Sequence, residues 1–105
     1  MGTLDGYDPC PEGREGVVDF GHGVRGRFTV NGAGQRVGMI ESHDGPDGQR
    51  CAGSLLFNVI EAADYGSNAP RWDVVSWEQL TLEPSLLCGE CGHHGYIRDG
   101  VWVPV

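Results

Sequence analysis

The chain has 105 residues, with 15 acidic and seven basic side chains and a formal net charge of −8. Such a length suits one domain with a modest core. The acidic balance disfavours nucleic acid as a partner, because nucleic-acid binding depends on neutralising phosphates. No stretch is apolar enough to cross a bilayer, and the start lacks the features of a signal peptide. We therefore expect a cytoplasmic protein with no membrane contact and with another protein as its partner.

The chain divides into a polar, weakly patterned N-terminal segment and a β-rich remainder. Residues 1–13 are expected to be irregular, and residues 14–105 to form a single domain stabilised by zinc. Residues 42–50 are dense in Gly, Asp, Pro and Ser, which predicts a loop. The runs with the composition or alternation of strands are residues 24–30, 35–41, 54–60 and 71–77.

The C-terminus carries the clearest local signal. Asp99 and Gly100 stand between two β-prone triplets, and Asp-Gly favours a two-residue hairpin turn because a type I′ turn needs positive φ at both central positions. This turn would place Ile97 opposite Trp102 on a shared apolar face that packs on the core. The predicted fold class is small all-β, a meander of short antiparallel strands with little helix, ending in this hairpin.

Just before the hairpin, Cys88 and Cys91 stand three positions apart, and His94 follows at the same interval. Thiolate sulfur and imidazole nitrogen are the ligands that Zn²⁺ prefers, and structural zinc is usually closed by four of them. A tight turn could present these three side chains to one ion. Cys51, at the start of a buried strand, is the expected fourth ligand. The predicted metal site is therefore Cys51, Cys88, Cys91 and His94, with Zn²⁺ as the ion.

Other assignments of the cysteines and histidines stay open. Cys10, His43 or His93 could replace Cys51 or His94 as a ligand. A Cys-x-x-Cys redox pair needs a βαβ context, and none is visible. A disulfide would suit an oxidising compartment, which a cytoplasmic chain does not enter.

The chain ending RWDVVSWEQLTLEPSLLCGECGHHGYIRDGVWVPV resembles a group of short, uncharacterised zinc-knuckle-like proteins of actinobacteria and actinobacteriophages. Their endings share the pattern LTLxPSLLCxxCGxHG[FY]IRxGxW, and CAGSLLF from residue 51 resembles a further element of the group. The group keeps the position of His94 and varies that of His93, so the resemblance favours His94 as ligand and supports Cys51. It implies a phage or prophage origin and a zinc-stabilised domain, but no reaction.

The function predicted from the sequence is a phage-derived zinc-binding protein that acts as a protein-interaction module, with the zinc in a structural role. The first alternative is a zinc knuckle that binds single-stranded nucleic acid, which the acidic charge disfavours. The second is a zinc-dependent hydrolase or nuclease. Because four good ligands leave no open position for water or substrate, a non-catalytic protein is favoured and no catalytic residue is assigned.

Overall fold

The computed structural model describes residues 2–4, 7–46, 48–65 and 69–105, with the backbone alone for residues 2–4. The fold is nearly all β, as predicted. Among the described residues, the one helical element is the 3₁₀ turn η1 (Ile60–Ala62). No helix in this part of the chain is long and apolar enough to span a membrane. The strands are β1 (Gly2–Leu4), β2 (Val18–Gly21), β3 (Val24–Val30), β4 (Arg36–Asp44), β5 (Arg50–Phe57), β6 (Arg71–Ser76), β7 (Thr81–Glu83), β8 (Leu86–Leu87), β9 (His94–Arg98) and β10 (Val101–Pro104).

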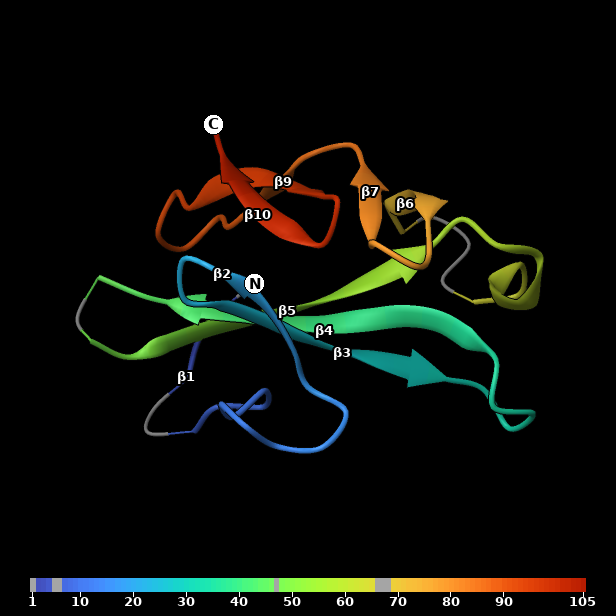
Figure 1. Ribbon diagram of the computed structural model, residues 1–105, viewed down its shortest axis with the longest axis horizontal. Helices are drawn as coiled ribbons and strands as arrows, with labels where there is room; N and C mark the ends of the chain where they lie inside the picture. The colour runs from blue at the N-terminus through green and yellow to red at the C-terminus, as the bar shows by residue number, and fades with distance from the viewer. Residues whose placement is uncertain (1, 5–6, 47, 66–68) are drawn as a thin grey trace.

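The strands form a large curled sheet and a small three-stranded sheet that lies over it (Figure 1). The large sheet has the order β2-β3-β4-β5-β6-β7, with β1 paired to β5. The small sheet has the order β10-β9-β8. The predicted meander is broken where β1 pairs with β5, where the chain passes between sheets from β7 to β8, and where β5 and β6 pair in parallel. The segment between them must therefore cross over instead of turning back as a hairpin.

The core lies between the two sheets and follows from strand alternation. On β3, Val24 is buried while Arg25 faces the opposite side of the sheet, and on β9, Ile97 is buried between two more accessible neighbours. Side chains from both sheets therefore meet in one apolar cluster. Its buried members are Phe20, Val24, Met39, Leu55, Phe57, Leu80, Leu82, Leu86, Ile97 and Trp102.

The C-terminal hairpin forms in the predicted register. Ile97 pairs with Trp102, and both are buried. Asp99 and Gly100 have φ values of 53° and 76°, the left-handed geometry that a type I′ turn requires. The turn also docks on the large sheet, because the Gly100 N–H donates to the Leu80 carbonyl at 2.9 Å.

Three segments differ from the expectation. The strand expected over residues 54–60 is β5 (Arg50–Phe57), and Ile60 begins η1. Residues 42–44 belong to β4 and residue 50 begins β5, so the predicted loop over residues 42–50 is limited to residues 45–49, of which residue 47 lies outside the described residues. The N-terminal segment, expected to be irregular, contains β1, paired antiparallel with β5. Residues 1, 5 and 6 of that segment lie outside the described residues.

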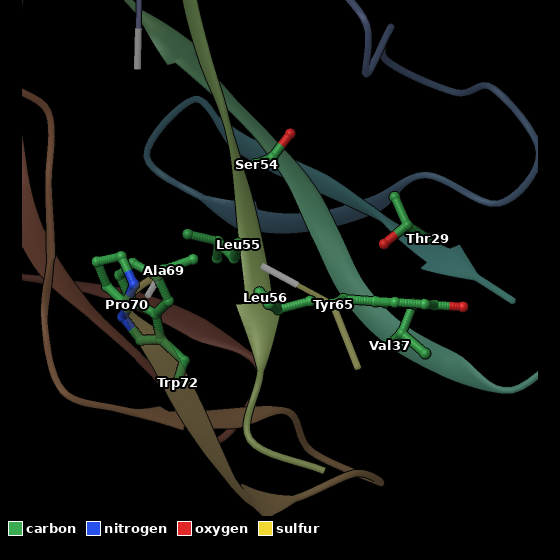
Figure 2. A pocket seen from close by; sticks show the side chains of 9 residues that line it. All are labelled: Thr29, Val37, Ser54, Leu55, Leu56, Tyr65, Ala69, Pro70 and Trp72. Atoms are coloured by element: carbon green, nitrogen blue, oxygen red, sulfur yellow. The ribbon is translucent and has the colours of Figure 1, made fainter. Parts of the chain in front are cut away.

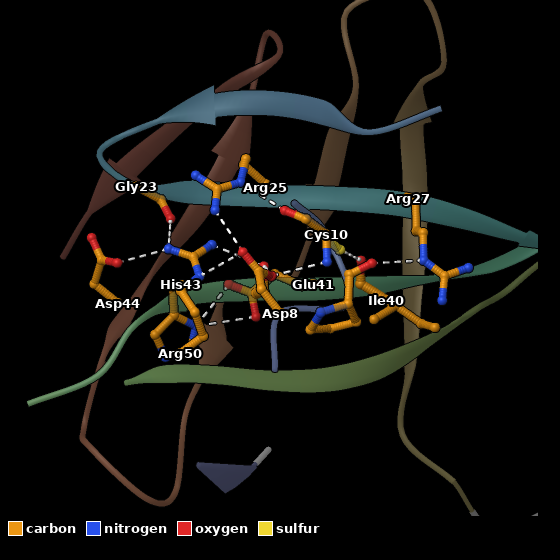
Figure 3. Close-up of polar contacts among 12 residues, drawn as sticks. Asp8, Cys10, Gly23, Arg25, Arg27, Ile40, Glu41, His43, Asp44 and Arg50 are labelled. Atoms are coloured by element: carbon orange, nitrogen blue, oxygen red, sulfur yellow. Dashed lines mark hydrogen bonds and ion pairs between the residues drawn. The ribbon is translucent and has the colours of Figure 1, made fainter. Parts of the chain in front are cut away.

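Asp8 fixes the rest of the N-terminal segment to the sheet face that points away from the core (Figure 3). Its carboxylate accepts hydrogen bonds from Arg25 at 2.7 Å and Ser42 at 2.9 Å, and lies 3.3 Å from Arg50 Nε. Burial alone would raise the pKa of Asp8, but the Cys10 N–H, the Arg25 guanidinium and the neighbouring groups together lower that pKa below its usual value. The ionised carboxylate therefore holds the segment in place.

Candidate functional site

Three cysteines and a histidine meet between the two sheets. One ligand atom from each of His43, Cys51, Cys88 and Cys91 lies within 4.8 Å of every other. His43 and Cys51 are directly paired on β4 and β5, so their side chains share one face of the large sheet. Cys88 and Cys91 come from the turn between β8 and β9. The cluster therefore joins the large sheet to the small one.

The turn that carries Cys88 and Cys91 is closed by its own backbone. The Cys88 N–H donates to the His93 carbonyl at 2.8 Å, and the Gly92 N–H donates to the Cys88 carbonyl at 2.9 Å. Gly92 has a φ of 75°, a conformation that glycine adopts without a steric penalty. This geometry brings the two sulfurs to one side of a tight hairpin, as the Cys-x-x-Cys spacing predicts.

Glu41 orients the histidine of the cluster (Figure 3). His43 Nδ1 lies 2.9 and 3.2 Å from the two carboxylate oxygens of Glu41, and both side chains are 1% exposed. The Nδ1–H therefore donates to the carboxylate. His43 Nε2 then points at the sulfurs and lies 3.3 Å from Cys91 Sγ. A carboxylate behind a ligating histidine is the usual supporting arrangement at protein metal sites.

The protonation of the cluster follows from its contacts. Burial alone would lower the pKa of His43, but the hydrogen bond and charge of Glu41 raise that pKa above its usual value. Burial would raise the pKa of the Cys88 thiol, but backbone N–H groups of its own turn and the contact with His43 lower it. Burial, with the contacts to Cys88 and Cys51, raises the pKa of Cys91 to about 11. A metal ion that binds these sulfurs must displace thiol protons, so its binding weakens as the pH falls.

His93 lies beside the cluster and stacks between two rings. Its ring centroid is 4.2 Å from that of His43 and 4.6 Å from that of Trp102, with interplanar angles of 9° and 13°. Glu41, His43 and His93 form a second group whose ligand atoms lie within 4.8 Å of one another. In that group Glu41 and His43 would both bind the ion, and their hydrogen bond to each other would be lost. The set with three sulfurs keeps this hydrogen bond and is therefore the better metal site.

Three of the four predicted ligands come together, and the fourth does not. Cys51, Cys88 and Cys91 are members of the cluster, but the histidine that completes it is His43 and not His94. His94 begins β9, and strand alternation turns its side chain to the outer face of the small sheet. Cys10, weighed as an alternative ligand, lies on the far side of the large sheet, where its thiol donates to the Ile40 carbonyl at 3.4 Å.

His94 has a different neighbour, the hydroxyl of Ser85. His94 Nε2 and Ser85 Oγ are 2.8 Å apart and half-buried. Leu87 pairs with His94 across β8 and β9, so Ser85, two residues before Leu87, sits diagonally across from His94 on the same face. The Ser85 carbonyl accepts a hydrogen bond from Trp72 Nε1 at 3.3 Å. This distance meets the geometric requirement for a serine nucleophile and a histidine base, and no third group among the described residues is hydrogen-bonded to the His94 side chain.

A pocket of about 430 Å³ lies elsewhere on the molecule (Figure 2). It is mainly apolar and is lined by β3, β4 and β5 together with the chain leading into β6. Val37, Leu56, Tyr65 and Trp72 are among its walls. Neither the cysteine cluster nor Ser85 lines it, but its wall residue Trp72 donates a hydrogen bond to the Ser85 carbonyl.

Comparison with protein families gives a match over the C-terminal part of the chain. Residues 46–105, more than half of the chain, match the family described as "Bacterial ubiquitination-like system serine protease (BubE)". The matched region contains Ser85 and His94 and the three clustered cysteines, whereas His43 lies just outside it. No curated protein and no solved structure is significantly similar to the chain. The phage origin implied by the chain ending stays a prediction.

Proposed function

The chain belongs to the family of bacterial ubiquitination-like system serine proteases (BubE), and on that premise we propose that it is a peptidase whose nucleophile is Ser85 and whose general base is His94. The observation that carries the proposal is the 2.8 Å contact between Ser85 Oγ and His94 Nε2. The expectation from the sequence favoured a non-catalytic module. The proposal differs from that expectation because the contact between Ser85 and His94 depends on the pairing of β8 with β9, which the sequence pattern does not reveal.

The proposed reaction uses water as its co-reactant and balances as follows. In the tautomer with its proton on Nδ1, His94 Nε2 accepts the hydroxyl proton as Ser85 Oγ attacks the carbonyl carbon of a peptide bond. His94 then gives this proton to the leaving amine as the C–N bond breaks, which leaves an ester on Ser85. Water, deprotonated by His94, hydrolyses the ester and releases the carboxylic acid, and the proton returns to Ser85. Among the described residues no carboxylate is hydrogen-bonded to His94, so the proposed unit is a pair rather than a triad.

The other described serines fit the role less well. Ser42 is fully buried, and its hydroxyl is bonded to Asp8 and Arg50. Ser54, exposed on β5, and Ser76, at the end of β6, have no imidazole contact among the residues that the structure describes. Ser85 combines a histidine partner with partial exposure. It is therefore the serine that could meet both a base and a substrate.

Hydrolysis of a fluorescently labelled peptide mixture tests the proposal. Ser85→Ala and His94→Ala are expected to lose about 10²-fold or more of the wild-type rate, since the nucleophile or its base is gone. Ser54→Ala, an exposed serine elsewhere on the molecule, is the matched control and should keep the wild-type rate. Circular dichroism and metal content would show that each variant folds. Wild-type hydrolysis by Ser85→Ala would exclude Ser85 as the nucleophile.

We also propose that the cluster of His43, Cys51, Cys88 and Cys91 holds Zn²⁺ in a structural role. The donor set fits zinc, which takes three sulfurs and one imidazole nitrogen in a closed tetrahedron, with neighbouring ligand atoms about 3.5–3.8 Å apart. The ligand atoms here lie within 4.8 Å of one another, and His43 Nε2 is 3.3 Å from Cys91 Sγ. The ion would clip the β8–β9 turn to β4 and β5. Its part in hydrolysis is to keep Ser85 and His94 in place.

The remaining sequence-based expectations take their place within this proposal. A protein partner becomes the protein substrate of the peptidase, in the cytoplasm, and binding of single-stranded nucleic acid remains the alternative. A salt-dependent oligonucleotide titration separates the two. Tight binding that weakens steeply with salt would favour the nucleic-acid alternative.

A further inference from the structure

The outer face of the small sheet around Ser85 and His94 is apolar and accessible. Leu87 is 61% exposed, Val103 38% and Val105 75%. Half-buried Tyr96 lies between them and pairs with Val103. In a small soluble domain, an apolar surface beside a nucleophile is typical of a binding surface.

The backbone of Leu87, beside Ser85, can also receive a strand, whereas the Ser85 carbonyl already accepts a hydrogen bond from Trp72 Nε1. β8 is an edge strand of the small sheet. Because the Cys88 N–H donates to the His93 carbonyl, Leu87 and His94 form the non-hydrogen-bonded kind of antiparallel pair. The N–H and C=O of Leu87 therefore point away from β9, toward the edge of the sheet. Extended peptides commonly bind such edges through main-chain hydrogen bonds.

Any carbonyl that Ser85 attacks must approach its hydroxyl to about 3–3.5 Å. An extended chain advances about 3.3 Å per residue, so the residues flanking that carbonyl come within reach of the side chains that neighbour Ser85, among them Leu87 on β8 and Tyr96 on β9. Arg98 is a charged residue next to this face. Its guanidinium lies 3.9 Å above the Tyr96 ring and forms no ion pair with the residues that the structure describes. This positive charge disfavours a basic partner surface and is compatible with a peptide.

We propose that this face binds an extended, apolar segment of a protein substrate, which pairs with the backbone of Leu87 at the edge of β8 and packs its side chains on Leu87 and Tyr96. The proposal rests on Ser85 acting as the nucleophile. It adds the substrate class: an unfolded tail or linker with Val, Ile or Leu close to the bond that is cleaved. Leu87 is its principal specificity residue, because it is both exposed and next to the reacting pair.

The test is cleavage of a synthetic peptide library, with the cleaved positions read by mass spectrometry. The wild type should cleave where Val, Ile or Leu lies within two residues of the bond. Leu87→Asp should lose about tenfold or more in kcat/KM for these peptides, while its Ser85 still reacts with a small fluorophosphonate. The matched control is Ile60→Asp, which changes an 86% exposed residue of η1 and should cleave like the wild type.

Three results would overturn the inference while Ser85 remains the nucleophile. They are cleavage without apolar preference, a Leu87→Asp variant with wild-type kcat/KM, and a wild type that reacts with fluorophosphonate but cleaves no peptide. A wild-type dimer that Leu87→Asp converts to a monomer, with kcat/KM unchanged, would assign the face to self-association. A wild type whose Ser85 does not react with fluorophosphonate would remove the proposed function itself and this inference with it.

Discussion

Glu41 is a residue whose burial requires an explanation, because a 1% exposed carboxylate is costly unless it is paired. Its contact is His43, at 2.9 Å. The proposed structural metal site would explain the pair. The carboxylate fixes the tautomer that leaves His43 Nε2 free to bind an ion, and it supplies negative charge next to a cation.

Glu41→Gln should therefore weaken metal affinity by about 10–100-fold, because an amide orients the imidazole less firmly and carries no charge. Competition with a chromophoric chelator measures the affinity. Glu61→Gln, an exposed position of η1, serves as the control and should bind like the wild type. Equal affinities for Glu41→Gln and the wild type would mean that Glu41 does not support a metal ligand.

Asp8 gives a pH-dependent prediction. Its pKa is lowered in the folded chain, so its contribution to stability is present above the unfolded pKa and is lost as the pH falls through the folded value. Asp8→Asn should reduce the free energy of unfolding by about 1–3 kcal/mol at pH 7, because charge-assisted hydrogen bonds are lost. That difference should shrink below about pH 4. Urea unfolding of both proteins across this range checks it, and a difference independent of pH would contradict the assignment.

At the scale of elements, the β9–β10 hairpin was predictable because its determinants are local. Asp99-Gly100 sets the turn, and the register and the buried Ile97–Trp102 pair follow from it. The parallel pairing of β5 with β6 could not be read in the same way. It depends on how the intervening segment crosses over, and no short sequence pattern encodes that path.

The turn itself can be tested by Gly100→Ala. Gly100 has a φ of 76° and open space around its Cα, so the cost comes from the left-handed backbone alone, about 1–2 kcal/mol. The control is Gly32→Ala, which also has open space but no positive φ. Urea unfolding should show a lower stability for Gly100→Ala than for Gly32→Ala. Equal stabilities would mean that the turn does not require the left-handed conformation.

At the scale of the whole molecule, the proposed metal joins the two sheets that enclose the core. Chelation, or Cys51→Ser, should lower the melting temperature markedly and abolish hydrolysis, because the β8–β9 turn would lose its attachment to β4 and β5. Cys10→Ser changes a buried thiol on the far side of the large sheet and should keep one metal ion per chain. A melting curve unaltered by chelation would exclude the structural role.

The sequence predicted much of the metal cluster but little of the reacting pair. The Cys-x-x-Cys spacing identified Cys88 and Cys91, and the start of a buried strand identified Cys51. His43 falls within the predicted loop over residues 42–50, so the sequence pattern does not place it opposite Cys51 on β4. The available signal for His43 is its spacing of two residues from Glu41, which places both side chains on the same face of a strand. Ser85 and His94 come together because the Cys-x-x-Cys turn closes a hairpin that pairs β8 with β9. The sequence pattern alone does not reveal this pairing.

The most direct test of the central claim is to map the adduct formed by a fluorophosphonate on the metal-loaded protein. Peptide mass spectrometry should place the adduct on Ser85, with a labelling rate that falls about 10²-fold or more in His94→Ala. An adduct on another residue, the absence of any adduct, or an equal labelling rate in His94→Ala would contradict the assignment of Ser85 and His94 as nucleophile and base.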